Sequence, residues 1–164
     1  MKLRLLFISI IISSLGFSQD DLSKLLKKYN QESIPYISVR ELAISETNAV
    51  LLDAREPEEF AVSHLKNAVF VGYYDFNIRT VTDTIKNKDQ DIVVYCSLGI
   101  RSEDIAIKLK KEGYKNVKNL FGGIFEWKNN NLKIYNQKNQ TTDSIHAFSK
   151  KWSKWLKNGK LVFD

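Results

Sequence analysis

Residues 91–102 read DIVVYCSLGIRS, and they are the most informative part of the sequence about the fold. Residues 91–95 form a continuous, β-branched run, which is typical of a buried parallel strand. The strand stops at Cys96, and residues 102–111 then carry apolar side chains among charges, which predicts a helix that ends at Gly113. Cys96 is therefore expected at the carboxyl end of a parallel strand, where ligands of open α/β sheets collect.

The rest of the chain alternates strand and helix signals. We expect further strands at residues 36–37, 49–52, 68–71 and 117–120, and helices at 22–29, from Ser38, from Pro57 and within 74–90. Strands separated by helical stretches indicate a parallel sheet with helices on both faces. The predicted fold class is therefore α/β, with a mostly parallel central sheet, helices on both faces and an extra C-terminal helix.

Length and composition limit the other possibilities. The chain has 164 residues, 25 Lys and Arg, 19 Asp and Glu, a formal net charge of +6, one Cys and two His. A single Cys excludes an internal disulfide framework and any multi-Cys metal site, and we expect no metal and no cofactor. The modest charge argues against a nucleic-acid partner. We expect one main domain at residues 34–130, preceded by a helix within 19–33.

Residues 1–18 have the layout of a secretory signal peptide. A positively charged start precedes a mostly apolar run over residues 5–12, and the small Gly16 and Ser18 precede a cut before Gln19. The apolar run is shorter than the roughly 20 residues that a membrane-spanning helix needs, although an uncleaved N-terminal anchor is the competing interpretation. The sequence therefore predicts export to the periplasm or the extracellular space.

The loop that follows the central strand carries the candidate chemistry. It is long enough to curl around the sulfur of Cys96 with its backbone N–H groups pointing inward, and Gly99 permits the angles that such a curl needs. These N–H groups and the next helix form an anion nest, to which Arg101 adds its charge or a hydrogen bond to the loop. A thiol in this position is expected to be a nucleophilic thiolate near neutral pH.

The candidate site residues have different expected roles. Cys96 is the catalytic residue, although a lone Cys after a buried strand can also be an inert core thiol. Ser102 either contacts substrate or caps the following helix, and Ser97 either contacts substrate or caps the loop. The candidate substrate-binding residues are Ser97, Leu98, Gly99, Ile100, Arg101 and Ser102.

Four separated motifs resemble those of the rhodanese family of sulfurtransferases. In chain order they are LLDAREPEEF at residues 51–60, SHLKNA at 63–68, CSLGIRS at 96–102, and GY at 113–114 with NLFGGIFEW at 119–127. Ser63 and Asn67 stand where glycines are common in the family, and Lys66 stands where Pro is common. The resemblance implies a rhodanese-like domain over residues 34–130.

The resemblance also implies a reaction cycle. Cys96 would take a sulfur atom from thiosulfate or a similar small-molecule donor, hold it as a persulfide and pass it to cyanide or a thiol. Arg101 follows Cys96 after four residues, whereas the related phosphatases and arsenate reductases use Cys-x5-Arg, a wider loop. Asp53 and Arg55 are expected to form a structural ion pair or loop brace near the site, and Glu59 and His64 are also expected to be structural.

Three other functions stay open at this point. The chain could be a catalytically idle module that binds a partner, although such modules commonly lose the Cys. It could be a phosphatase or arsenate reductase, which the short loop opposes. Cys96 could also act in thiol redox chemistry, which would require an external thiol because the chain holds no second Cys.

Residues 131–164 lie outside the resemblance. We expect a linker followed by an amphipathic helix over residues 142–157, in which Ile145, Phe148, Trp152 and Trp155 recur at a spacing of three and four. Such a helix would dock on the domain, or it would offer a surface to a protein partner or an anionic membrane.

Overall fold

The computed structural model describes residues 20–44 and 48–163, and these divide into two compact units between Glu32 and Ser33. Within the first unit, residues 20–29 are helical, as the spacing of apolar residues predicts. The predicted signal peptide at residues 1–18 lies outside the described residues, so that it stays a prediction. In the described part of the chain, no helix combines the length and apolar character needed to cross a membrane.

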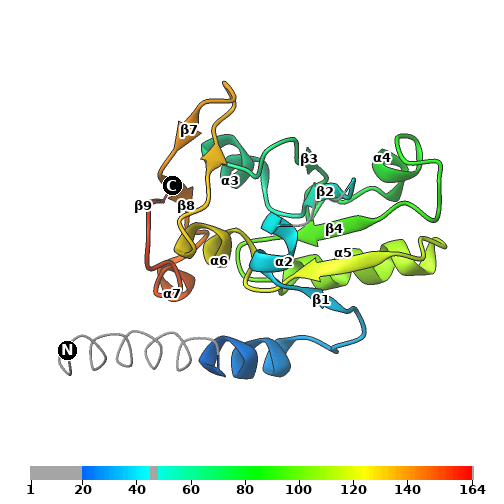
Figure 1. Ribbon diagram of the computed structural model, residues 1–164, viewed down its shortest axis with the longest axis horizontal. Coiled ribbons are helices and arrows are strands. Elements are labelled where there is room, and N and C mark those ends of the chain that lie inside the picture. Colours follow the sequence, from blue (N-terminus) through cyan, green and yellow to red (C-terminus); the bar gives the residue numbers. More distant parts are fainter. Residues whose placement is uncertain (1–19, 45–47, 164) are drawn as a thin grey trace, which may run out of the picture. The chain divides into compact units, whose positions relative to one another are not determined.

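The second unit is built on one five-stranded sheet in which all pairs of strands are parallel (Figure 1). The strands follow the order β1-β5-β4-β2-β3. Their bounds are β1 Tyr36–Ile37, β2 Val50–Asp53, β3 Val69–Phe70, β4 Ile92–Tyr95 and β5 Val117–Leu120. The predicted α/β class and parallel sheet are confirmed.

The strand order decides which helices share a face of the sheet. The helices are α2 Val39–Ile44, α3 Pro57–Val62, α4 Ile78–Thr82, α5 Arg101–Lys111 and α6 Gly123–Asn129. Right-handed crossovers place α2 and α3 on one face and α4 and α5 on the other, because the connections run in opposite directions across the sheet. In agreement, Val81 of α4 and Leu109 of α5 share a buried cluster with Val94 of β4.

The connections that leave the neighbouring strands β2 and β4 run to opposite sides of the sheet. From β2 it continues through α3 to β3, and from β4 it continues through α5 to β5 on the opposite side. A crevice opens at the carboxyl ends of two strands whose connections diverge in this way. Cys96 directly follows β4, and Asp53 ends β2, so both lie at this crevice.

The helix predicted over residues 142–157 is wrong. The segment forms β7 Thr141–Thr142, β8 Ser144–His146 and only a short α7, Lys150–Ser153, before β9 Lys160–Val162. β8 pairs with β9 in parallel, and Ile145 is fully buried where β8 lies against α3. Isolated helices of this length are marginally stable, so that strand pairing and burial override the helical spacing. A partner-binding or membrane-binding helix at residues 142–157 therefore has no structural basis.

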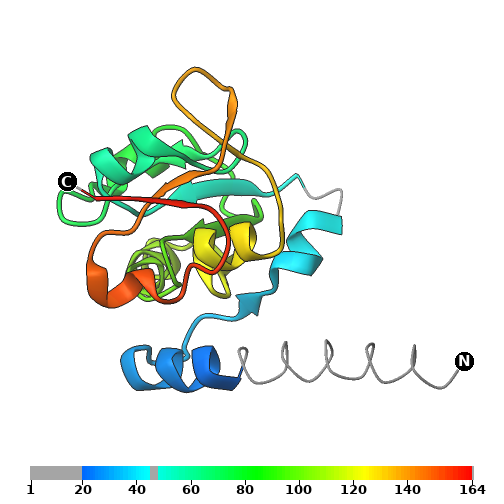
Figure 2. The same ribbon diagram turned by 90° about the vertical axis from the view of Figure 1, so that its left-hand side faces the viewer.

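The C-terminal segment, residues 131–163, packs on the domain instead of forming a free linker. Figure 2 shows it, coloured orange to red, running beside α6. Asn129 at the end of α6 holds it by three hydrogen bonds: its Nδ2 donates to the carbonyl of Trp155 (2.9 Å), and its Oδ1 accepts from the backbone N–H groups of Lys157 (2.7 Å) and Asn158 (3.2 Å). β6 (Ile134–Tyr135) adds a bridge to His64.

We expect Asn129→Ala to loosen the C-terminal segment and to lower the free energy of unfolding by about 1–3 kcal/mol, because it leaves three backbone groups without their partner. Hydrogen exchange should increase at residues 155–158, and urea unfolding should measure the loss. The neighbouring Asn130→Ala is the matched control, because the side chain of Asn130 is exposed and bonds only to Glu126 within α6. Equal effects of the two substitutions would contradict this account.

Candidate active site

The loop between β4 and α5 curls around the sulfur of Cys96, as the sequence predicts. The backbone N–H of Gly99 donates to Sγ over 3.1 Å, and the Ser102 hydroxyl oxygen lies 3.5 Å from it. Gly99 has a φ of 106°, which is the left-handed region that favours glycine. The thiol is therefore held by backbone N–H groups at the start of α5, and it is buried without being isolated from polar groups.

Asn119 of β5 braces this loop from behind. Its Nδ2 donates to the carbonyl of Gly99 (2.8 Å), and its Oδ1 accepts from the Ser102 hydroxyl (2.8 Å). Ser102 is the second residue of α5 and not its N-cap, which is Ile100, so the predicted capping role is wrong. The Ser102 hydroxyl has a single proton, and its oxygen lies closer to Oδ1 of Asn119 (2.8 Å) than to the sulfur (3.5 Å). The role of Asn119 could not be predicted from the sequence, because a polar residue in a buried strand shows its partners only in the folded chain.

The start of α6 fixes the other side of the loop. The backbone N–H groups of Ile124 and Phe125 donate to the carbonyls of Cys96 (2.9 Å) and Ser97 (3.2 Å). These bonds turn the carbonyls away from the sulfur. Position 123 must be glycine here, because a Cβ would collide with the Cys96 carbonyl and lie 2.7 Å from the carbonyl carbon of Ser97, at a φ of +55°.

Arg101 is engaged by a buried carboxylate. Its two terminal nitrogens bind both oxygens of Glu59 (2.7 and 2.8 Å), and one of them also donates to the Ser97 hydroxyl (3.0 Å). The Ser97 hydroxyl in turn donates to Glu59 (2.9 Å). Burial raises the pKa of Glu59, but the hydrogen bond and charge of Arg101 lower it more, so that the net shift is downward. Glu59 thus links α3 to the loop, in keeping with its expected structural role.

Opposing influences set the pKa of Cys96. Burial raises the pKa of the thiol, whereas the positive charge of Arg101 and hydrogen bonds from Ser102 and Gly99 lower it, and the balance is a pKa below the ordinary value. A lowered pKa increases the fraction of thiolate at neutral pH. The geometry therefore favours a nucleophilic sulfur.

Asp53 and Arg55 form a fully buried ion pair beside the site. Arg55 binds both carboxylate oxygens of Asp53, and its Nη2 also donates to the carbonyl of Ser63. Burial lowers the pKa of Arg55, but the carboxylate of Asp53 raises it more, so that the guanidinium stays charged. The pair braces the connection after β2 and does not line the cavity described next, which agrees with the structural role expected for both residues.

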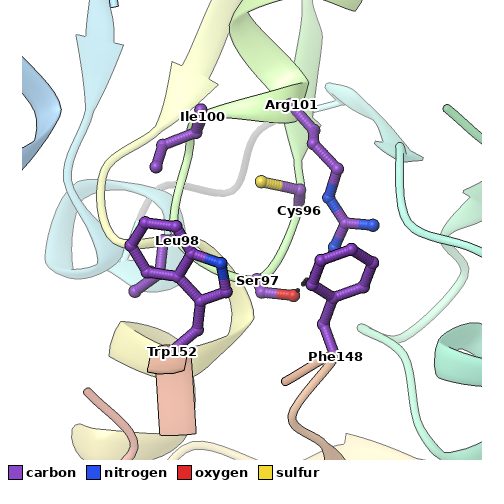
Figure 3. Close-up of a pocket in the computed structure, with 7 residues that line it drawn as sticks. All are labelled: Cys96, Ser97, Leu98, Ile100, Arg101, Phe148 and Trp152. Atoms are coloured by element: carbon purple, nitrogen blue, oxygen red, sulfur yellow. Dashed lines mark hydrogen bonds between the residues drawn. The ribbon is translucent and has the colours of Figure 1, made fainter. Parts of the chain in front are cut away.

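A cavity of about 110 Å³ opens above the sulfur (Figure 3). It is lined by Cys96, Ser97, Leu98, Ile100, Arg101, Phe148 and Trp152. Figure 3 shows the sulfur pointing into the space between these side chains. Of the predicted site residues, Gly99 and Ser102 do not line the cavity but contact the sulfur from the loop. Phe148 and Trp152 were not among the predicted site residues, because their spacing predicts the apolar face of an amphipathic helix.

Among the described residues, no group of three or more His, Cys, Asp and Glu side chains is placed to hold a metal ion. Backbone amides and one hydroxyl contact the sulfur, and the guanidinium of Arg101 adds its positive charge from nearby. This set suits stabilisation of negative charge on sulfur, the same electrostatic principle as an oxyanion hole.

The Arg101→Gln variant should have a higher Cys96 pKa than the wild type, because it removes the positive charge that favours the thiolate. Cys96 is the only Cys of the chain, so that ultraviolet thiolate absorbance against pH reports on this residue alone. As the pH falls, the thiolate signal should disappear at a higher pH in Arg101→Gln. Arg101→Lys keeps a positive charge and should bring the Cys96 pKa part of the way back to the wild-type value. Arg79→Gln, at an exposed residue of α4, should leave the Cys96 pKa unchanged. An Arg101→Gln variant with the wild-type midpoint would refute the role given to the charge of Arg101.

Gly123→Ala should both destabilise the protein and displace the loop. Gly113→Ala is the matched control, because Gly113 also has a positive φ but a Cβ there would meet nothing within 4 Å. Backbone strain from the positive φ should lower the free energy of unfolding of each variant by about 1 kcal/mol, as measured with urea. Only Gly123→Ala should lose more than this from its free energy of unfolding. It should also raise the Cys96 pKa, because the collision of the new Cβ with the backbone of Cys96 and Ser97 moves the loop amides away from the sulfur. A Cys96 pKa that is the same in both variants would contradict the role given to α6.

Comparisons with known proteins agree with this geometry. A family model described as the rhodanese-like domain matches residues 38–130, more than half of the chain. Similar curated proteins are named tRNA uridine(34) hydroxylase: that of Onion yellows phytoplasma is 37% identical over 90 residues, and that of Staphylococcus haemolyticus is 41% identical over 87. The matches cover 52% and 50% of this chain but only 29% and 27% of those proteins.

Solved structures share the fold at low sequence identity. A thiosulfate sulfurtransferase of Pseudomonas aeruginosa superposes with a TM-score of 0.60 at 19% identity, over 85% of this chain and 26% of that chain. A rhodanese-like domain from Anabaena gives a TM-score of 0.55 at 21% identity, over 62% and 79% of the two chains. At such identities the likeness concerns the fold alone. Together with the family model, it shows that this chain belongs to the rhodanese-like domain family.

Proposed function

We propose that the protein is a sulfurtransferase that carries sulfur as a persulfide on Cys96. The observation that carries this proposal is the Cys96 sulfur at the floor of a cavity, held by the Gly99 N–H at 3.1 Å. A persulfide has its negative charge on the outer sulfur, next to the same amides and the same guanidinium. The site thus stabilises charge before and after the sulfur is taken up.

The proposed cycle has two displacement steps. The Cys96 thiolate attacks the outer sulfur of thiosulfate or a similar donor, the S–S bond of the donor breaks, and the donor leaves with the electron pair, as sulfite in the case of thiosulfate. A thiophilic acceptor, cyanide or a thiol, then attacks the terminal sulfur of the persulfide and releases the Cys96 thiolate. Both steps balance without an outside oxidant or reductant, and neither needs a metal or a general base.

The position and the hydrogen bonds of Arg101 argue against the competing phosphatase function. A tetrahedral phosphate needs a cation aimed at it, but Arg101 is bound by both oxygens of Glu59. The loop also places Arg101 only five positions after Cys96. Both features favour sulfur transfer over phosphate or arsenate chemistry.

The name of the curated relatives does not extend to this chain. The chain spans less than a third of the hydroxylases that it matches, so that most of each of those proteins has no counterpart in the alignment. The family model places the Cys96 loop within the rhodanese-like domain, residues 38–130. Sulfur transfer rests on that loop alone and is therefore the function that we propose.

Intact-mass spectrometry after exposure to thiosulfate tests the proposal. The wild-type protein should gain the mass of one sulfur atom, and cyanide should remove it with the formation of thiocyanate. Cys96→Ser should gain nothing, because the chain has no other Cys. An idle binding module would stay unmodified with every donor, and turnover of an aryl phosphate would favour the phosphatase function instead.

A further inference from the structure

Two aromatic side chains from outside the matched family region close one side of the cavity. Phe148 and Trp152 lie in the C-terminal segment, whereas the family model ends at residue 130. In Figure 3 the indole of Trp152 lies beside Leu98, and the ring of Phe148 lies in front of the guanidinium of Arg101. The sulfur of Cys96 faces the space between them.

The backbone holds Phe148 in an unfavourable conformation. Its φ is +59°, a region that bulky residues rarely adopt, and its side chain stays 40% exposed. The turn that imposes this angle is well fixed: the Phe148 N–H donates to Nδ1 of the buried His146 (3.1 Å), and Ala147 donates to the carbonyl of Val162. Such strain persists only where the surrounding structure determines it, and it is concentrated at functional sites.

Charge at the cavity disfavours a doubly charged donor. Arg101 supplies the one cationic side chain of the lining, and it already binds Glu59 and lies 4.0 Å from Glu56. Two carboxylates therefore surround one guanidinium, whose face is covered by the ring of Phe148 at 4.5 Å. The remaining lining side chains are mostly apolar, and the thiosulfate dianion finds no free cation among them.

We propose that Phe148 and Trp152 form an apolar subsite that selects sulfur donors carrying a small organic group, such as a phenyl ring, next to the transferable sulfur. The proposal rests on sulfur transfer at Cys96 and names the donor class for that reaction. The volume of about 110 Å³ is on the order of the space that a benzene molecule occupies in an apolar cavity. The aromatic rings would contact the organic group while the loop amides receive the sulfur.

The reaction with such a donor balances as before. The Cys96 thiolate attacks the outer sulfur of an aryl thiosulfonate, the S–S bond breaks, and an aryl sulfinate leaves with the electron pair. The persulfide anion on Cys96 then passes its sulfur to cyanide as thiocyanate. In this two-step cycle, kcat/KM for the donor reports only on the loading of sulfur.

The test compares three donors: thiosulfate, methanethiosulfonate and benzenethiosulfonate. The last two carry the same charge and differ in the organic group. We expect the ratio of kcat/KM for benzenethiosulfonate to that for methanethiosulfonate to fall on the order of tenfold in Phe148→Ala and in Trp152→Ala. Intrinsic donor reactivity cancels, because each variant is compared with the wild type on the same donors.

Phe163→Ala is the matched control, an exposed aromatic residue of the same segment that does not line the cavity, and it should leave the ratio unchanged. If an Ala variant fails to fold, Phe148→Leu and Trp152→Leu should lower the ratio in the same direction by a smaller factor. A ratio that stays at the wild-type value in every folded variant, while Cys96 still gains sulfur, overturns the subsite alone. Absence of sulfur on Cys96 with all three donors overturns the proposed function as well.

Discussion

The bonds from the first turn of α6 to the carbonyls of Cys96 and Ser97 are the constraint on which the site depends. The C=O and the N–H of a trans peptide group point in opposite directions, so a peptide that turns its carbonyl outward turns its N–H inward. The loop therefore presents N–H donors to the sulfur. This arrangement requires α6 to approach the loop backbone closely. Gly123 permits that approach, since any side chain there would occupy the space of the Cys96 and Ser97 backbone.

The electrostatics of the site follow from burial and compensation. Two arginines are largely or fully buried at the crevice, and each has a carboxylate partner: Asp53 for Arg55 and Glu59 for Arg101. Removing one partner of such a pair would leave an uncompensated charge in a region of low dielectric constant. The guanidinium of Arg101 therefore stays near the sulfur at a fixed position, where it lowers the pKa of Cys96 while its hydrogen-bonding capacity is used by Glu59 and Ser97.

The C-terminal segment, which lies outside the residues that the family model matches, contributes Phe148 and Trp152 to the lining of the cavity. Its strands β8 and β9 pair with each other, and Asn129 anchors the stretch that follows α7. These contacts fix the turn at Phe148 and place α7 beside the cavity. Residues far from Cys96 in the sequence thus line the same cavity as its sulfur.

The parallel α/β fold, the position of Cys96 at a strand end and the curl of its loop could all be predicted from the sequence, because they depend on local patterns: a β-branched run, a glycine and a helix start. The ion pair of Asp53 and Arg55 also follows from two nearby residues at such an end. The roles of Asn119 and Ser102, and the arginine that Glu59 binds, became visible only in the folded chain, because their partners lie on other elements. The same reason explains the wrong helix at residues 142–157: the spacing of its apolar residues is helical, but strand pairing and burial against α3 give those residues different neighbours, which no local pattern records.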